Sequence, residues 1–221
     1  MGREIIQLKH NSPEWLAFRN TGIGASDAAA VLGLSKWKTN VELWEEKVGL
    51  RKPKDLSDSD VVKYGTAAEK YLVGLFALQY ADKYRVEVDK NKVYLKDGFQ
   101  FASLDGELTE ISTGEQGNYE GKTVLVNSAA VWDNWKGKIP MPYYVQILHQ
   151  LLTTGWKFTV IKPEFRWNDE NGELVTQCRH ITIRTTDEAV PDDMKLLDEK
   201  EHEFWEFVKS KKRPPLLLPK I

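Results

Sequence analysis

The chain has 221 residues, of which 41% are hydrophobic and eight are tryptophan, so it is long enough to bury a full core as one domain. Its formal net charge of −2 excludes a strongly basic protein that coats nucleic acid. The single cysteine, Cys178, excludes a disulfide framework and a cysteine-ligated metal cluster, and it suits a reducing cytoplasm.

Membrane insertion and secretion are not expected from the sequence. No apolar run approaches the roughly 20 residues that are needed to span a bilayer. Residues 1–4 are not followed by the apolar segment of a signal peptide. We therefore expect a cytoplasmic protein with no membrane partner.

The first predicted helix, over residues 13–20, begins with a serine cap, a proline and a glutamate, and it carries Arg19. A glycine-rich stretch then leads to Ser26, the expected cap of a short helix over residues 26–32. A helix start with a hydroxyl and an arginine nearby suits a phosphate group. The alternative is that Ser26 is only a cap and Arg19 only a surface cation.

A third helix, over residues 39–48, is predicted from a threonine–glutamate capping box at its start and a glycine stop. Basic residues lie on both sides of it and are candidates for contact with DNA; they are Lys36, Lys38, Arg51 and Lys52. Such a cluster can equally be a solvated loop.

A long helix is predicted over residues 60–81, where apolar residues recur at helical spacing. Glu69 falls on the same face as Leu72 and Phe76. A carboxylate buried there without a partner would cost several kcal/mol, so a metal or a cation is implied. The alternative is that Glu69 lies at the rim of the face and reaches water.

Strands are predicted over residues 84–88, 92–96, 99–104 and 118–124. Asp105 closes the third strand, and Glu120 and Lys122 share one face of the fourth because side chains two apart in a strand point the same way. If these two strands pair as a hairpin, the two carboxylates meet at one end of it, which suits Mg²⁺. The alternative is an ordinary Asp-Gly turn and a solvated strand.

The C-terminal half is predicted to contain helices over residues 128–136 and 142–152, strands over 156–167 and 174–184, and a last helix over 188–212. Gln146 lies on a polar stripe of the second of these helices, which can be a solvated face or the lining of a groove. We interpret residues 1–210 as a single α/β domain with a mixed central sheet flanked by helices. Residues 211–221 form a basic, proline-broken tail that is too polar to join the core, and its leucines are expected to pack on another subunit or a partner.

Taken in order, these motifs resemble the phage-lambda-type exonuclease family of YqaJ-like viral recombinases, within the PD-(D/E)xK nuclease superfamily. The resemblance covers residues 12–155. It rests on Trp15, Arg19, Gly24-Ala25-Ser26, Tyr64-Gly65, Glu69, Asp105-Gly106, Glu120-Gly121-Lys122, Tyr144 and Gln146. Leu104 stands where many relatives have a proline before the acid, which should alter the turn and not the ligand.

The resemblance implies a metal centre and its nucleophile. Asp105, Glu120 and the backbone carbonyl of Gly121 resemble the ligands of Mg²⁺, for which Mn²⁺ would substitute. Glu69 resembles the helical carboxylate that serves a second metal, directly or through water. Lys122 resembles the lysine that activates the attacking water.

The resemblance also implies how the substrate is held. Gln146 resembles the glutamine beside the metal centre, while Arg19 and Ser26 resemble the residues that hold a 5′-phosphate. Residues 123–130 contain no arginine or lysine, so a DNA-contacting cation expected there in relatives must come from elsewhere.

The implied function is a phage or prophage Mg²⁺-dependent exonuclease that digests one strand of duplex DNA from its 5′ end to mononucleotides and leaves a 3′ overhang for recombination. A ring-shaped homotrimer and a single-strand annealing partner are implied by the resemblance alone. The alternatives are an endonuclease of the same superfamily, a non-catalytic protein that binds DNA ends, and, more remotely, an unrelated α/β binding domain with dispersed carboxylates.

Overall fold

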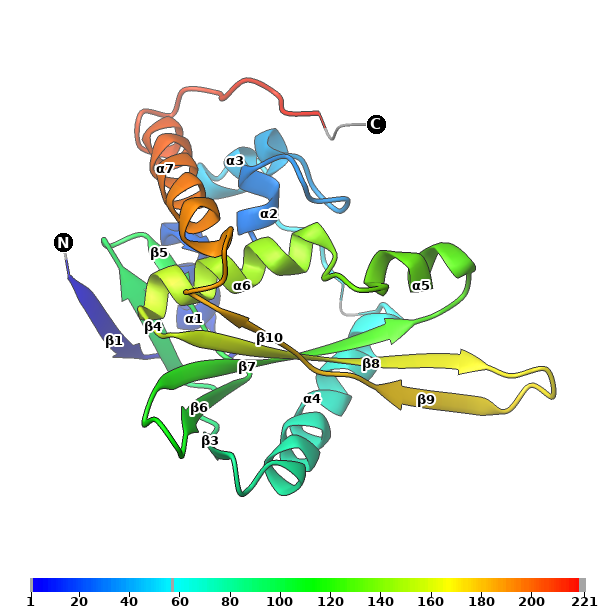
Figure 1. Cartoon of the computed structure of the whole chain (residues 1–221). Coiled ribbons are helices and arrows are strands. Elements are labelled where there is room, and N and C mark those ends of the chain that lie inside the picture. The colour runs from blue at the N-terminus through cyan, green and yellow to red at the C-terminus, as the bar shows by residue number, and fades with distance from the viewer. Residues whose placement is uncertain (1, 57, 219–221) are drawn as a thin grey trace.

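The computed structural model describes residues 2–56 and 58–218 and contains two sheets and seven α-helices within those ranges (Figure 1). The helices are α1 (Pro13–Phe18), α2 (Ala28–Val31), α3 (Asn40–Lys47), α4 (Asp60–Gln79), α5 (Ala129–Trp135), α6 (Met141–Thr154) and α7 (Val190–Lys209), with a 3-10 turn, η1 (Arg19–Thr21), after α1. The strands are β1 (Arg3–Gln7), β2 (Ile23–Gly24), β3 (Tyr84–Glu87), β4 (Lys92–Lys96), β5 (Gln100–Ala102), β6 (Gly106–Glu110), β7 (Gln116–Leu125), β8 (Phe158–Asn168), β9 (Leu174–Cys178) and β10 (Ile181–Arg184).

The strands divide between a smaller and a larger sheet. The smaller sheet has the order β1-β4-β5-β2, and the larger has the order β10-β8-β7-β6-β3, with β9 added to β8. The central pair of the larger sheet, β7 and β8, is parallel, and its other pairs are antiparallel. The prediction of an α/β fold with a mixed sheet flanked by helices is therefore confirmed.

Helices cover both faces of the larger sheet, because its central strands carry apolar residues on both sides. Phe76 of α4 packs with Tyr119 and Phe158 on one face. On the other face, Ile147 of α6 packs with Phe165, and α5 extends this layer. Side chains that alternate along β7 therefore point to α4 or to α6 in turn.

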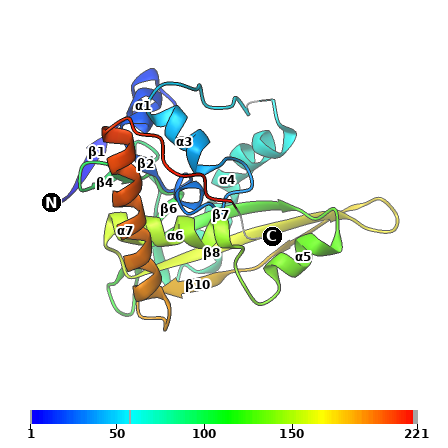
Figure 2. The same cartoon turned by 90° about the horizontal axis from the view of Figure 1, so that it is seen from above.

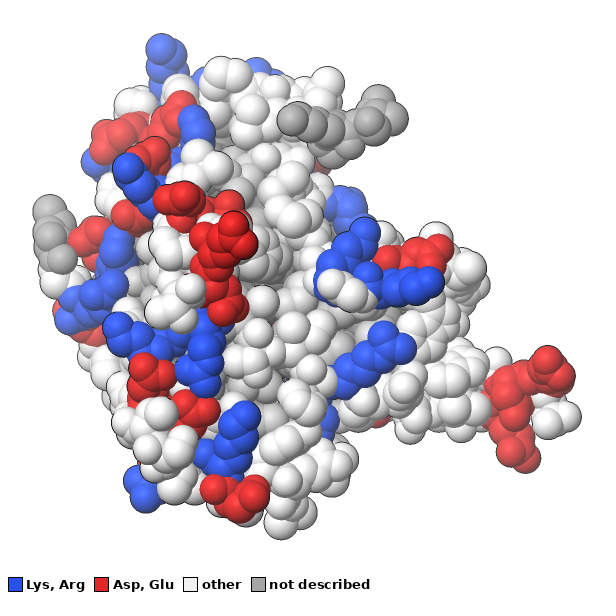
Figure 3. Space-filling model, in the orientation of Figure 1, with Lys and Arg blue, Asp and Glu red and all other residues white. Residues whose placement is uncertain are grey.

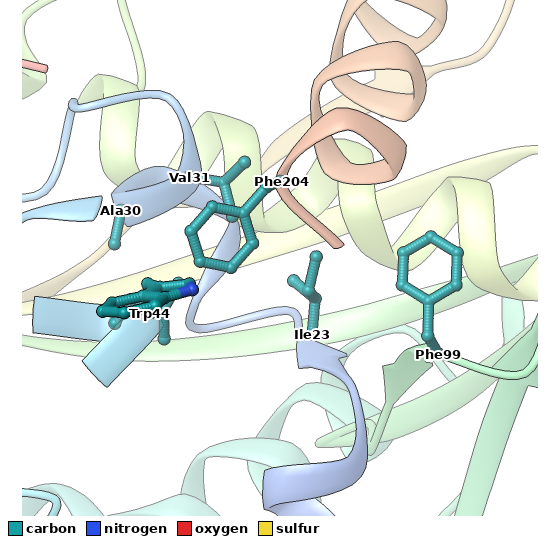
Figure 4. Packing of buried hydrophobic residues seen from close by; sticks show 7 residues of the cluster. Ile23, Ala30, Val31, Trp44, Phe99 and Phe204 are labelled. Carbon is teal, nitrogen blue, oxygen red and sulfur yellow. The ribbon is translucent and has the colours of Figure 1, made fainter. Parts of the chain in front are cut away.

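The short helices α2 and α3 pack with α7 above α6, as the view from above shows (Figure 2). Phe204 of α7 points into a cluster with Ile23, Val31 and Trp44, and Phe99 closes it on the side of the smaller sheet (Figure 4). This cluster anchors the glycine-rich segment that leads from η1 to α2.

The predicted helix ends agree with the structure where capping residues mark them. Thr39 and Glu42 form the expected capping box at the start of α3. Pro142 lies in the first turn of α6, and Gly155 ends that helix in a left-handed conformation, with φ of 74°. None of the helices in residues 2–56 and 58–218 is both long and apolar enough to cross a bilayer.

The predicted hairpin partner of the Glu120 strand was wrong. β5, which corresponds to the predicted strand 99–104, pairs with β2 and β4 in the smaller sheet. The antiparallel neighbour of β7 is β6, which was not predicted because its five residues are mostly polar or glycine. Asp105 directly precedes β6, so the expected meeting of Asp105 with Glu120 occurs through a different strand.

Two further expectations differ from the structure. Asp27, and not Ser26, stands at the N-cap position of α2, so the Ser26 hydroxyl is not used as a cap. The predicted strand 174–184 is divided into β9 and β10, and β9 forms with β8 a hairpin that projects from the body of the molecule (Figure 1).

The tail contacts its own chain near Asn40, but its leucines stay exposed (Leu216 45%, Leu217 42% and Leu218 74%), so their packing on another subunit or a partner stays a prediction. The Asn40 side chain donates to the Pro215 carbonyl oxygen at 2.8 Å and accepts from the Leu217 backbone N–H at 3.0 Å. Pro214 is buried. Leu217 lies so close to Gly33 that a Cβ on this glycine would be 2.7 Å from the Leu217 Cβ.

Candidate active site

Strand β7 supplies a carboxylate and an ammonium side by side on the face that α6 covers. The Glu120 side chain is only 3% exposed, and its Oε1 forms a close ion pair with the Lys122 ammonium. Gln146 of α6 donates to Oε1 at 2.8 Å, and Gln150, one turn later, donates to Oε2 at 2.6 Å. Both oxygens of this buried carboxylate therefore have partners.

Asp105 reaches the same place from the start of β6. The last register pair of the β6–β7 hairpin is Gly106 opposite Tyr119, so Asp105 and Glu120 come next to each other. The backbone N–H of Gly121 donates to Asp105 Oδ2 at 2.9 Å, which fixes the carboxylate against β7.

Glu69 approaches from α4, on the other side of the larger sheet. Gly65 allows this helix to come close, because a Cβ there would lie 3.3 Å from Thr123 Oγ1 of β7. Glu69 follows one turn later, and its carboxylate forms a close ion pair with Lys90. Lys90 also donates to Asp105 Oδ1 at 3.2 Å. The partner that the sequence implied for Glu69 is thus a lysine in this structure.

These groups line one cavity of about 480 Å³. Its lining includes all the side chains expected at the metal centre, together with Ser26; they are Glu69, Asp105, Glu120, Lys122 and Gln146, with Gly121 between. Ser26 and Gln146, which lie 120 positions apart in the sequence, therefore meet at one opening.

Burial and neighbouring charges set the protonation of the β7 pair. Burial raises the pKa of the Glu120 carboxyl, and the negative charge of Asp105 adds to this rise although Lys122 opposes it. Burial alone would lower the pKa of Lys122, but Glu120 and Asp105 outweigh it and raise that pKa. Lys122 therefore keeps its proton and acts as a hydrogen-bond donor, not as a free amine.

A second cavity of about 180 Å³ adjoins the first and contains the two residues expected to hold a phosphate. Arg19 donates to Ser26 Oγ at 3.2 Å and lies over the Trp15 ring, 5.1 Å from its centroid. Two buried side-chain atoms in this lining, Ser103 Oγ and His10 Nδ1, have no hydrogen-bond partner among residues 2–56 and 58–218. Two hydroxyls, an imidazole and a guanidinium are groups that suit an anion.

The basic residues predicted to contact DNA lie outside these cavities, and two of them are paired with acids. Lys38 binds Glu46 at 2.6 Å, and Arg51 binds Glu42 at 2.8 Å. Lys36 lies over the Trp37 ring, and Lys52 is exposed. On the face seen in Figure 3, basic and acidic side chains are intermingled, with no continuous basic band.

The chemistry of the donor set fits a hard divalent cation. Asp105, Glu120 and Glu69 offer carboxylate oxygens, and Gly121 offers a backbone carbonyl, which are the ligands that Mg²⁺ and Mn²⁺ take. Within the described ranges, 2–56 and 58–218, no group of three or more acidic, histidine or cysteine side chains is already arranged for a metal. Instead, lysine ammonium groups form ion pairs with the carboxylates: Lys90 with Glu69, and Lys122 with Glu120.

A known family matches the part of the chain that contains these site residues. The profile of the YqaJ-like viral recombinase domain matches residues 14–157. The chain belongs to this family. The uncharacterized protein YqaJ of Bacillus subtilis is 33% identical over 156 residues, which are 69% of this chain and 43% of that protein. The chain thus matches less than half of that relative's length.

Solved structures share the fold. An alkaline exonuclease from Laribacter hongkongensis, called LHK-Exo, has a TM-score of 0.53 at 21% identity over 90% of this chain and 97% of its own. Its crystal structure with dAMP gives a TM-score of 0.55 at 20% identity, covering 91% of this chain and 97% of that one. A phage-related exonuclease from Haemophilus somnus gives 0.54 at 10% identity, over 86% and 96%.

Sequence reasoning missed some residues of the site. Lys90 lies in the turn between β3 and β4, and nothing in its local sequence shows that the turn reaches α4. Gln150 lies one helical turn after Gln146, and that spacing was the available signal for its contact with Glu120. Ser103 and His10 carry no pattern that separates them from surface residues.

Proposed function

We propose that the chain is a divalent-metal-dependent nuclease that removes nucleotides from the 5′ end of one strand of duplex DNA. The observation that carries the proposal is the convergence of Asp105, Glu120, Glu69 and Lys122 on one cavity beside Arg19 and Ser26. Membership of the YqaJ-like family and the fold shared with two exonucleases support it.

Each residue has a role in this proposal. Asp105, Glu120 and the Gly121 carbonyl would hold Mg²⁺ or Mn²⁺. A bound ion supplies Lewis-acid activation of the scissile phosphate and lowers the pKa of a bound water. Lys122 donates a hydrogen bond from Nζ that orients the attacking hydroxide, and Gln146 fixes both Lys122 and Glu120 by its two hydrogen bonds.

The smaller cavity explains how the cut could be placed one nucleotide from the end. A terminal 5′-phosphate there would receive hydrogen bonds from Arg19 and Ser26, and the free Ser103 hydroxyl could add another. Gln146, Glu69 and Asp105 line this cavity as well as the larger one, so the next phosphate of the strand would lie at the carboxylates. This placement favours release of mononucleotides.

A homotrimeric ring and a single-strand annealing partner are part of the same proposal, because they follow from the family resemblance. Lys36 and Lys52 are the two predicted DNA contacts that form no ion pair in the described residues, so they are the better candidates for contact with the duplex. The product would be a 3′ overhang suited to recombination in a bacterial cytoplasm.

One experiment tests the reaction and its polarity together. Linear duplex DNA carrying a phosphate at only one 5′ end is incubated with Mg²⁺, and the remaining strands are sequenced. We expect the phosphorylated strand to shorten from its 5′ end while a covalently closed circle stays intact. An Asp105→Asn variant controls for contaminating nucleases.

The other outcomes have definite meanings. Cutting of the closed circle would assign the chain to the endonucleases of its superfamily. Binding to DNA ends with no Mg²⁺-dependent product would leave a non-catalytic end-binding protein.

A further inference from the structure

Lys90 lines the smaller cavity beside Glu69 and Asp105, the two carboxylates that line the larger cavity as well. Its ammonium forms a close ion pair with Glu69 Oε1 and donates to Asp105 Oδ1 at 3.2 Å and to the Leu104 carbonyl oxygen at 3.4 Å. All three partners are hard oxygen atoms, two of them carboxylate oxygens from different elements. This is the donor set that a divalent cation would take at the same point.

The position of Lys90 is built into the fold and is not that of a free surface side chain. The turn that carries it is closed by the Asn91 N–H, which donates to Asp89 Oδ1 at 3.0 Å. The same turn is tied to the segment after β1, because the Leu8 N–H donates to the Asn91 carbonyl oxygen at 2.8 Å and the His10 N–H donates to Asn91 Oδ1 at 3.0 Å.

We propose that the Lys90 ammonium takes the place of a second divalent ion, so that this chain holds one resident metal at Asp105 and Glu120. This rests on the proposed nuclease function. It changes the role of Glu69, which serves as the partner of Lys90 and not as a metal ligand.

The charges of the cavity agree with a single ion. In the fully ionised site, the three carboxylates of Asp105, Glu120 and Glu69 face two ammonium groups, those of Lys90 and Lys122. One divalent ion then leaves a small positive excess, which suits a phosphodiester. A second ion beside Lys90 would add two more positive charges within a few ångströms of an ammonium, which Coulomb repulsion opposes.

The test counts bound Mn²⁺ on metal-free protein without DNA, by the electron paramagnetic resonance signal of free Mn²⁺. We expect one ion per chain in the wild type and two in Lys90→Met, with the spectrum of a coupled Mn²⁺ pair in the variant. Lys70→Met is the matched control, because Lys70 is next to Glu69 in the sequence but lies over the Tyr71 ring. It should bind one ion, as should Lys90→Arg, which keeps the charge.

Each remaining outcome overturns the proposal. Two ions in the wild type, or one ion in both Lys90→Met and Lys90→Gln when circular dichroism shows them folded, would mean that Lys90 does not substitute for a metal. No ion in any variant would remove the metal assignment of the proposed function as well. Two ions in Lys90→Met support the proposal even if no DNA is cut, so the failures of the two proposals are distinguishable.

Discussion

Gln150 donates a 2.6 Å hydrogen bond to Glu120 Oε2 from beneath the floor of the cavity, and its own amide oxygen accepts from Asn118 at 2.8 Å. All three side chains are buried. The two hydrogen bonds of Gln150 tie the orientation of Glu120, a proposed metal ligand, to the packing of α6 on β7. If the Gln150 amide were rotated, the buried Glu120 Oε2 would lose its donor.

Replacing Gln150 by leucine should therefore weaken metal binding without touching the metal. We expect Mn²⁺ affinity to fall by about tenfold or more, since outer partners of a ligand typically contribute about 10- to 100-fold. Calorimetric titration measures it. Thr154→Val, one turn further along α6, is the control, because in the described part of the chain the Thr154 hydroxyl bonds to the Gln150 carbonyl oxygen and the Trp156 N–H and not to the site. Equal affinity in Gln150→Leu and the wild type would contradict the role.

Lys122→Ala should abolish turnover and leave binding to DNA ends nearly intact. The ammonium is proposed to orient the nucleophile, so its loss should lower the rate by about 100-fold or more. Nuclease and gel-shift assays measure the two quantities separately. Lys209→Ala, an exposed lysine of α7, should match the wild type in both. Parallel loss of rate and binding in Lys122→Ala would assign Lys122 to DNA binding.

Arg19→Ala should remove the preference for 5′-phosphorylated over 5′-hydroxyl ends. The guanidinium is held between the Trp15 ring and Ser26 Oγ, where it would meet a terminal phosphate. The ratio of the two degradation rates is the readout. Arg19→Lys should retain part of the preference, since the charge remains but the forked donor is lost. An unchanged ratio in Arg19→Ala would place the phosphate elsewhere.

Gly22→Ala should destabilise the protein strongly, and Gly74→Ala should not. A Cβ at Gly22 would lie 2.2 Å from the Phe99 carbonyl oxygen, and backbone atoms cannot move aside cheaply. We expect a loss of about 2 kcal/mol or more in the free energy of unfolding. A Cβ at Gly74 would meet no described atom beyond its own helix turn within 4 Å, and the residue is exposed on α4, so alanine should add about 0.5–1 kcal/mol. Denaturant unfolding of both variants checks this, and similar midpoints would contradict the steric argument.

The buried pair of His149 and Glu201 should make stability depend on pH. His149 Nδ1 lies 2.7 Å from Glu201 Oε1 and Nε2 lies 2.9 Å from the Phe101 carbonyl oxygen, so both ring nitrogens face acceptors and both carry protons. Burial alone would lower the pKa of His149, but the Glu201 carboxylate outweighs it and raises this pKa above its usual 6.5.

A raised histidine pKa stabilises the fold fully below the unfolded value and loses that contribution as the pH rises through the folded value. The melting temperature should therefore fall as the pH rises above about 6.5 and through the raised pKa of His149. In Glu201→Gln the histidine loses its charged partner, so this fall should be reduced. An equal fall of the melting temperature with pH in Glu201→Gln and the wild type would refute the coupling of His149 to Glu201.

Features with a local signal were predictable from the sequence. The ends of α3 and α6 follow from capping residues next to the helix, and the shared face of Glu120 and Lys122 follows from the period of a strand. The family resemblance then grouped residues whose roles no local pattern gives.

What the sequence did not predict depends on contacts between distant segments. β6 is short and polar, so the sequence pattern favoured the more apolar run before Asp105 as the strand that pairs with β7. Lys90 meets Glu69 only because the turn after β3 lies against α4. The position of Leu217 against Gly33 depends in the same way on the fold around Asn40.

Asp105 is the residue at which the chain crosses from one sheet to the other. Leu104 before it is buried with Tyr94 and Ala102 of the smaller sheet, and Gly106 after it opens β6 of the larger one. An ion bound by both Asp105 and Glu120 would therefore link the smaller sheet to the larger one, although each sheet has its own hydrogen bonds. Local unfolding of the smaller sheet alone would move the Asp105 carboxylate away from Glu120, and the proposed metal site would be lost while β7 and α6 were still folded.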